Sequence, residues 1–236
     1  MLVPHTWQVE RPFVEYRGVA WYRRTLEAPS EWQNSAVRIE IEAVFHTASI
    51  WVNGELAGEH ARKGYTAFVI DITRLLRWGN SNTIVVRVDS AFNGNMLPRG
   101  RSSDWAHDGG IYRPVQLLIT AKTFVERVDL EAVPDLASGD GALTITAYLR
   151  NTDSQPWTGR AFFRIIDDET GLTVVTSPDT PGLTVKSGAI QAEKFAATLP
   201  KAKLWHFDHP NLYRLIFSMA SGQETHRFTV TFGSGN

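Results

Sequence analysis

The stretch ASIWVNGELAGEH, residues 48–60, decides the fold of the first half of the chain. It places Asn53 and Gly54 between two runs that alternate apolar and polar residues. Asparagine and glycine tolerate positive φ, which both central residues of a two-residue hairpin turn require. The stretch therefore predicts two antiparallel strands joined at Asn53-Gly54.

The sequence on both sides of this hairpin also reads as β-structure. In AVRIEIEAV, residues 36–44, Val37, Ile39 and Ile41 alternate with charged residues. A period of two is typical of a strand with one buried and one wet face. Two further strands are predicted for NTIVVRVDS (82–90) and IYRPVQLLIT (111–120).

One segment breaks the strand pattern. In FVIDITRLLRWGN, residues 68–80, Asp71 precedes an apolar pair, Leu75 and Leu76, and Gly79 follows. A carboxylate caps the free N–H groups at a helix start, and glycine commonly follows a helix end. The segment predicts a short helical turn that Asp71 caps and Gly79 ends.

After Thr120 the strand pattern begins again. Leu143, Ile145, Ala147 and Leu149 share one face of ALTITAYLRN (142–151), and a second hairpin is predicted around Asp168–Gly171. About seven short strands in this half are the number expected of an immunoglobulin-like sandwich. The remaining predicted strands are FVERVDLEAVPD (124–135), NLYRLIFSM (211–219) and THRFTVTFG (225–233).

Length and composition limit the class of protein. The chain has 236 residues and a net charge of −1, divided as +1 over residues 1–121 and −2 over 122–236. Neither half has the positive field that nucleic acid or an anionic membrane attracts, so neither partner is expected. Without cysteine, disulfides and thiolate chemistry are excluded. The start MLVPHTW does not resemble a signal peptide, and cytoplasmic, periplasmic and secreted locations all stay open.

Polar residues crowd into SSDWAHDGGIYRPVQLLIT, residues 102–120, just before a predicted strand. Asp104, His107 and Asp108 lie within five positions, followed by Gly109 and Gly110. Three interpretations are open: a catalytic centre, a metal site, or a polar turn. The residues alone favour the surface turn, with the glycine pair providing backbone freedom.

Both chemical alternatives need residues from elsewhere in the fold. A triad of Ser102 or Ser103 with His107 and Asp108 would have to form within one loop, whereas triads assemble from separate elements around an oxyanion hole. A metal site on Asp104, His107 and Asp108 would need more ligands, for which His46 and His60 are the candidates. No metal site is therefore expected, apart from weak binding of a hard cation at Asp104.

Six stretches, taken in order, resemble the N-terminal, non-catalytic half of glycoside hydrolase family two, which contains β-galactosidases, β-glucuronidases and β-mannosidases. The most specific are the hairpin region 48–88 and DGGIYRPVQL at 108–117. The other four are VPHTW (3–7), GVAWYRRTLEAP (18–29), KLWHFDHPNLYRL (203–215) and FTVTFG (228–233). The resemblance therefore covers nearly the whole chain.

The resemblance implies an all-β fold of two domains. Residues 1–121 would form a jelly-roll, galactose-binding-like β-sandwich, the family's sugar-binding domain, and residues 122–236 an immunoglobulin-like β-sandwich. In the family a TIM barrel follows and carries the two catalytic glutamates for retaining hydrolysis of β-glycosides. Since this sequence stops at FGSGN, the barrel is expected to be absent, no catalytic residue is assigned, and this chain alone is expected to be inactive.

The resemblance also implies roles in the 104–113 region. In β-galactosidases and β-glucuronidases of the family, an aspartate six residues before the glycine of the GI pair contacts the sugar and, in some members, a monovalent cation. Asp104 stands in that position relative to Gly110. Trp105 and His107 are further substrate-binding candidates, while Gly109, Gly110 and Arg113 are expected to be structural, with Arg113 paired to a buried carboxylate or carbonyl.

The predicted function is the accessory part of a retaining β-glycosidase, which shapes one wall of the active site and braces the barrel. Its partners would be a β-glycoside carbohydrate and the catalytic barrel of the same parent chain; a homo-oligomer stays open, and no cofactor is expected. One alternative is a free-standing carbohydrate-binding module that uses exposed aromatic residues such as Trp78 or Trp105. A pair of structural or adhesive domains is the third. The subfamily stays open, because QVERPFVEYRG (8–18) cannot be aligned with the second polar loop of the family's galactosidases and no second contact residue can be named.

Overall fold

A computed structural model describes residues 2–96 and 107–235 as two compact units, Met1–Ile119 and Thr120–Asn236. Strands make up most of each unit, and the described residues contain no α-helix. The predicted all-β class is therefore confirmed. Among the described residues, no helix is long and apolar enough to cross a membrane.

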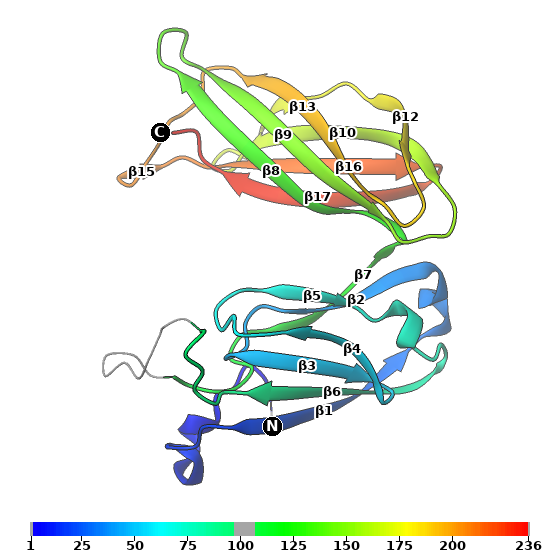
Figure 1. The fold of residues 1–236 in the computed structure, drawn as a ribbon. Coiled ribbons are helices and arrows are strands. Elements are labelled where there is room, and N and C mark those ends of the chain that lie inside the picture. Colours follow the sequence, from blue (N-terminus) through cyan, green and yellow to red (C-terminus); the bar gives the residue numbers. More distant parts are fainter. Residues whose placement is uncertain (1, 97–106, 236) are drawn as a thin grey trace. The chain divides into compact units, whose positions relative to one another are not determined.

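The first unit is a sandwich of two sheets (Figure 1). One sheet has four strands in the order β1-β6-β3-β4, and the other has three in the order β5-β2-β7. The strands are β1 (Val19–Ala28), β2 (Ser35–Ile41), β3 (Thr47–Val52), β4 (Glu55–His60), β5 (Phe68–Asp71), β6 (Asn80–Asp89) and β7 (Val115–Ala121). Four short 3-10 helices connect them: η1 (Trp7–Val9), η2 (Arg11–Phe13), η3 (Ser30–Asn34) and η4 (Thr73–Leu75).

The hairpin at Asn53-Gly54 forms as predicted, with φ of 53° and 89° at the two turn residues. Asn53 also fixes its surroundings. Its Nδ2 donates to Asn82 Oδ1 and to the Leu75 carbonyl, each at 2.8 Å, and its Oδ1 accepts the N–H of Thr83 at 3.0 Å. One turn residue therefore ties the hairpin to β6 and to the end of η4.

Two sequence predictions need correction in this unit. The turn after Asp71 is a short 3-10 helix that ends at Leu75, with Asp71 Oδ1 accepting the Thr73 N–H at 2.8 Å. The last strand begins at Val115 rather than at residue 111. Pro114 has no N–H to donate to a ladder, and the Ile111 carbonyl already accepts the N–H of His5 at 2.7 Å.

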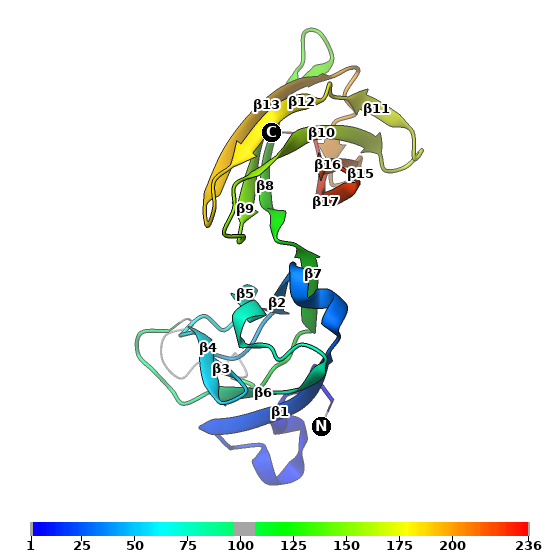
Figure 2. The same ribbon diagram turned by 90° about the vertical axis from the view of Figure 1, so that its right-hand side faces the viewer.

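The second unit is also a two-sheet sandwich, with the order β13-β9-β8 in one sheet and β11-β10-β16-β17 in the other, where β12 also pairs with β10. Figure 2 shows β8, β9 and β13 on one side of this unit and β16 and β17 on the other. The strands are β8 (Thr123–Asp135), β9 (Asp140–Asn151), β10 (Trp157–Asp167), β11 (Thr173–Thr176), β12 (Thr180–Val185), β13 (Ile190–Leu199), β14 (Trp205–His206), β15 (His209–Pro210), β16 (Tyr213–Ser221) and β17 (Glu224–Phe232).

Each unit has its own apolar core between its sheets. In the second unit the four residues predicted to share one face of β9 are all buried, which confirms that prediction. They pack against β10 and β16. The largest buried side chains of this core are Phe163, Phe217, Ile145, Leu149, Ile165, Leu199 and Leu215; in the first unit they are Phe45, Ile41, Ile50 and Ile72. Each core can therefore stabilise its own unit.

A charged cluster joins the β10–β11 turn to the segment before β14. Lys203 Nζ lies 2.9 Å from Asp167 Oδ2 and 3.0 Å from Glu169 Oε2. Asp167 Oδ1 accepts the N–H groups of Thr170 and Glu169 at 2.9 and 3.1 Å. The ammonium of Lys203, together with the Thr170 amide, lowers the pKa of Asp167 to about 2. The carboxylates of Asp167 and Glu169 in turn raise the pKa of Lys203.

Asp167→Asn should lower the thermal unfolding temperature at pH 7. A carboxyl whose pKa is lower in the folded state stabilises the fold above its unfolded pKa, about 3.9, and loses that contribution as the pH falls through about 2. The difference between wild type and variant should therefore shrink between pH 4 and pH 2. Circular dichroism melts across this range measure it.

Asp129→Asn is the matched control, because Asp129 pairs with Arg127 while both side chains are more than half exposed. An exposed pair contributes little, so this variant should melt close to wild type. Equal melting temperatures of the two variants at pH 7 would contradict the role assigned to Asp167.

Candidate functional site

The segment that precedes β7 is held between two distant parts of the first unit. On one side, His5 N donates to Ile111 O at 2.7 Å and Trp7 N to Gly109 O at 3.2 Å. On the other side, Phe45 N donates to Gly110 O at 3.0 Å. The backbone at 109–111 thus lies between the N-terminal residues and the residues that lead into β3.

Gly109 and Gly110 are buried, and the close packing around their backbone leaves no space for a side chain. A Cβ at Gly109 would lie 2.0 Å from Cζ2 of Trp7, which is itself only 4% exposed. At Gly110 the φ is 136°, and a Cβ would lie 2.4 Å from the His5 carbonyl oxygen. The glycine pair is therefore buried and not at the surface as expected. The positive φ of Gly110 does use the predicted backbone freedom, and both glycines also allow close packing.

An aromatic cluster of Phe45, Tyr65 and His107 lies beside this backbone. The His107 ring stacks on Phe45, with centroids 5.6 Å apart and planes 9° apart, and the centroid of the Tyr65 ring lies 5.7 Å from that of Phe45. Gly64 allows the close approach, since a Cβ there would meet Phe45 Cδ2 at 2.5 Å. The cluster holds the His107 ring in one orientation.

Two polar groups line the aromatic cluster. The Tyr112 hydroxyl donates to the Gly64 carbonyl, and burial raises the pKa of Tyr112. His107 Nε2 is buried and has no hydrogen-bond partner among the described residues. A buried imidazole nitrogen without a partner has hydrogen-bonding capacity left for a group outside the described chain.

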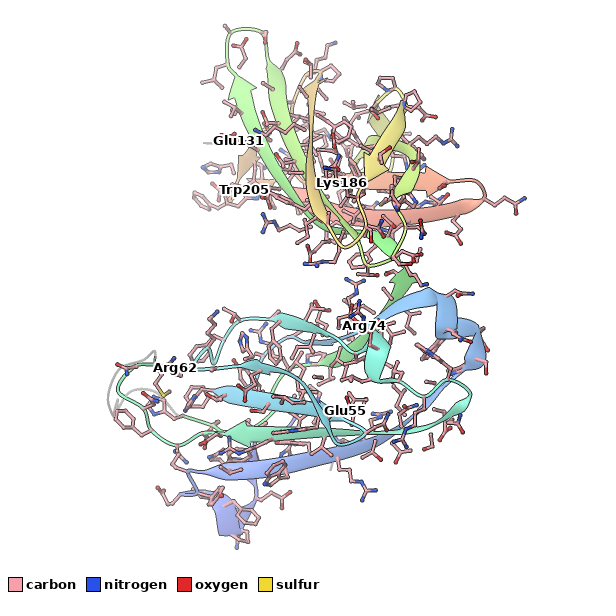
Figure 3. All side chains as sticks on the ribbon, turned by 45° about the vertical axis from the view of Figure 1, so that its right-hand side comes forward. Glu55, Arg62, Arg74, Glu131, Lys186 and Trp205 are labelled. Atoms are coloured by element: carbon pink, nitrogen blue, oxygen red, sulfur yellow. The ribbon has the colours of Figure 1, made fainter. Side chains whose placement is uncertain are left out.

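Two basic residues, Arg62 and Lys63, follow the end of β4, and Figure 3 labels Arg62 there. Arg62 N donates to Thr47 Oγ1 at 3.0 Å, and Lys63 N donates to the His46 carbonyl at 3.2 Å. These bonds fix the backbone that carries both basic side chains. The cluster itself offers aromatic faces and an imidazole, which are groups found in sites for polar ligands.

The structure places only part of the predicted site. Asp104 and Trp105 lie outside the described residues, as do Ser102 and Ser103 of the hypothetical triad. His107 belongs to the aromatic cluster, next to the glycine pair. Arg113 is exposed and makes no hydrogen bond or ion pair with any described residue, so the structure gives no support to a buried partner for it.

The two histidines considered as extra metal ligands are engaged elsewhere. His46 is buried, with Nδ1 2.9 Å from Thr47 Oγ1 and Nε2 2.8 Å from Ala91 O. His60 stacks on Phe68 and directs Nε2 to the Lys63 carbonyl at 3.1 Å, and burial lowers its pKa. Within residues 2–96 and 107–235, no group of three or more histidine, aspartate or glutamate side chains could hold a metal ion.

Sequence reasoning did not identify Phe45, Tyr65 and Tyr112 as part of this site. Phe45 is separated from His107 by more than sixty positions in the chain, and no local pattern links the two. The pair Gly64-Tyr65 was the available signal, because a glycine before an aromatic residue allows a close backbone approach.

Comparison with known families matches both units. The model described as "Glycosyl hydrolases family 2, sugar binding domain" matches residues 3–121, and the model "Glycosyl hydrolases family 2" matches residues 123–234. These matches cover nearly the whole chain. The chain belongs to glycosyl hydrolase family two, and its first unit is that family's sugar-binding domain.

Relatives and solved structures agree with this assignment. A β-galactosidase of Thermoanaerobacter pseudethanolicus is 32% identical over 211 residues, 89% of this chain and 27% of the relative. A β-glucuronidase of Bacteroides fragilis is 27% identical over 227 residues, which cover 92% of this chain and 32% of the relative. The crystal structure of a putative β-galactosidase from Bacteroides fragilis superposes with a TM-score of 0.90 at 26% identity, covering 99% of this chain and 36% of that one.

The chain spans only about a fifth to a third of the length of the curated relatives it matches. A β-glucuronidase from Bacteroides uniformis gives the same picture, with a TM-score of 0.88 at 27% identity over 99% of this chain and 28% of that one. This sequence therefore corresponds to one part of longer proteins.

Gly109→Ala should destabilise the first unit by about 1–3 kcal/mol, the usual cost of overpacking a core. The new methyl group would overlap Trp7 and push the N-terminal residues away from the 109–111 backbone. Urea unfolding followed by tryptophan fluorescence measures the change. Gly94→Ala is the control, because a Cβ there meets nothing within 4 Å; equal effects of the two substitutions would contradict the packing role.

Proposed function

We propose that this chain is the accessory N-terminal portion of a retaining β-glycosidase, in which it shapes one wall of the active site and braces a catalytic barrel. The observation that carries the proposal is the match along nearly the whole chain to β-galactosidases and β-glucuronidases that are three to four times longer. Both family models lie within this chain, so the remainder of the relatives has no counterpart in it.

In this proposal Asp104 contacts the sugar from the wall. An ionised carboxylate accepts hydrogen bonds from hydroxyl groups and so distinguishes sugars by hydroxyl position. The described residues on either side of this segment are Met96, which is buried, and His107, which is stacked on Phe45.

His107 and Trp105 would assist Asp104. The imidazole of His107, which is stacked on Phe45, would form part of the wall that carries Asp104. Trp105 would offer an apolar face to the sugar ring. A monovalent or other hard cation near Asp104 is compatible with the carboxylate chemistry.

The catalytic pair is assigned to the part of the enzyme beyond this chain. Retaining hydrolysis needs two carboxyl groups about 5 Å apart across the glycosidic bond, one as nucleophile and one as acid/base. A TIM barrel presents such residues at the ends of its strands. The partners of this chain are then a β-glycoside and the barrel domain, and assembly into a homo-oligomer is compatible with both.

The free-standing carbohydrate-binding module is the second candidate, and the comparisons do not favour it. The two curated relatives named above are enzymes by name, and they extend far beyond the matched region. A purely structural or adhesive pair of domains finds no more support. The accessory role and the free-standing module differ in the coding sequence expected after residue 236.

Reading the gene beyond the codon for Asn236 tests the accessory role first. We expect about 250 or more further residues with alternating strands and helices and two strand-end glutamates. A barrel produced separately should regain hydrolysis of a β-galactoside or β-glucuronide when this chain is added. A stop codon directly after Asn236 would overturn the proposal.

Asp104→Ala in the complete enzyme should lower kcat/KM by about 10- to 100-fold, the range for a lost hydrogen bond to a charged group. Hydrolysis of a nitrophenyl β-glycoside measures it. Asp104→Asn keeps one acceptor oxygen and should retain more activity than alanine. Glu55→Ala on the exposed hairpin is the control; turnover by Asp104→Ala equal to that of the control would remove Asp104 from the site.

A further inference from the structure

Two tryptophans lie together on the outer face of the four-stranded sheet. Trp21 on β1 is 61% exposed, and its ring centroid lies 5.6 Å from that of Trp51 on β3, with the planes tilted by 38°. Leu56 on β4 extends the apolar surface and is 55% exposed. Large apolar side chains gathered on a solvent-facing sheet are typical of a binding surface.

Strand register explains how the two indoles meet. Trp21 pairs with Arg87 on β6, which pairs with Ser49 on β3. Val85, two residues from Arg87 and on the same face, pairs with Trp51. The indoles thus approach diagonally across β6 and form one platform, which we call the indole platform: Trp21, Trp51 and Leu56.

Polar groups in fixed positions surround the indole platform. Arg87 Nη2 contacts Asp89 Oδ2 at 3.0 Å, and the Ser49 hydroxyl donates to Glu59 Oε1 at 2.7 Å. Arg23 is exposed, and its guanidinium has no hydrogen-bond or ion-pair partner among the described residues. These residues provide both donors and acceptors beside the apolar surface.

We infer that the indole platform is a second carbohydrate-binding surface, which takes a neutral oligosaccharide of at least two rings. Sugar rings offer an apolar C–H face to an indole, and their hydroxyls both donate and accept hydrogen bonds at the rim. Two indoles from different strands give room for more than one ring.

The balance of charge around the platform selects a neutral ligand. The rim carries two cationic side chains, Arg23 and Arg87, and two anionic ones, Glu59 and Asp89, so it has no excess of positive charge for uronate or sulfate groups. An aliphatic protein surface would remove these charged side chains from water, which is costly even for the pair that Arg87 and Asp89 form. Hydroxyl groups satisfy both signs without that cost.

This surface is separate from the wall proposed to contact the reacting sugar. The indole platform lies on the solvent face of β1, β6, β3 and β4. Phe45 instead precedes β3 in the chain and pairs with Gly110, and His107 stacks on Phe45. It would hold a longer glycan near the enzyme and needs no catalytic residue. The inference does not depend on the role of Asp104.

Titration of the 236-residue chain with cellohexaose, xylohexaose, β-1,4-galactohexaose and maltohexaose tests the inference. We expect at least one of them to shift the indole N–H signals of Trp21 and Trp51 in nitrogen–proton NMR spectra. Trp21→Ala should weaken the affinity by about tenfold or more, as expected for an aromatic anchor at the centre of a contact, while Trp21→Phe should lose less. Melting curves check that each variant folds, which exposure of Trp21 favours.

Phe207→Ala is the matched control, since Phe207 is 74% exposed on the second unit, and it should leave binding unchanged. Failure of all four sugars to bind would overturn the inference. Binding that survives Trp21→Ala, or Trp21-dependent binding of hexagalacturonate alone, would overturn it as well. Dimerisation through this face, detected by sedimentation and lost in Trp21→Ala, would assign the surface to a second copy instead.

Discussion

The first domain depends on the close packing of the backbone at Gly109 and Gly110 against Trp7 and Phe45. The N-terminal residues, the start of β3 and the approach to β7 meet there through hydrogen bonds at 2.7 to 3.2 Å. Any side chain at either glycine would overlap an indole or a carbonyl. Because the same backbone leads directly from His107, the packing that closes the sandwich also positions the entrance to the candidate site.

Local patterns predicted the parts of the fold that depend on neighbouring residues. The Asn53-Gly54 turn and the buried face of β9 can each be recognised from residues close together in the sequence. Both predictions are confirmed. The reason for the glycine pair was missed, because Trp7 and Gly109 are far apart in sequence and only folding brings them together. β13 was also missed: its alternation uses small and charged residues such as Ala192 and Glu193, which give a weak apolar signal.

The candidate site was less accessible to sequence reasoning than the fold. Family resemblance points to Asp104, while Phe45, Tyr65 and Tyr112 emerge only once β3 and the segment after β4 are folded. Physical chemistry accounts for this difference. A strand is predicted from a pattern along one segment. A binding wall is formed by single residues from several segments, and the sequence of one segment does not indicate which residues of the others lie beside it.

The contact between the two ends of the first domain also has a kinetic consequence. Gln8 Oε1 accepts the N–H of Gly109 across 101 positions of the chain. At a synthesis rate of about 5–20 residues per second, the N-terminal residues wait roughly 5–20 s on the ribosome before their partner exists. Until then the indole of Trp7 has no covering backbone, so the nascent domain exposes an apolar side chain that a chaperone can recognise. Contacts this long in sequence also slow the folding of the domain.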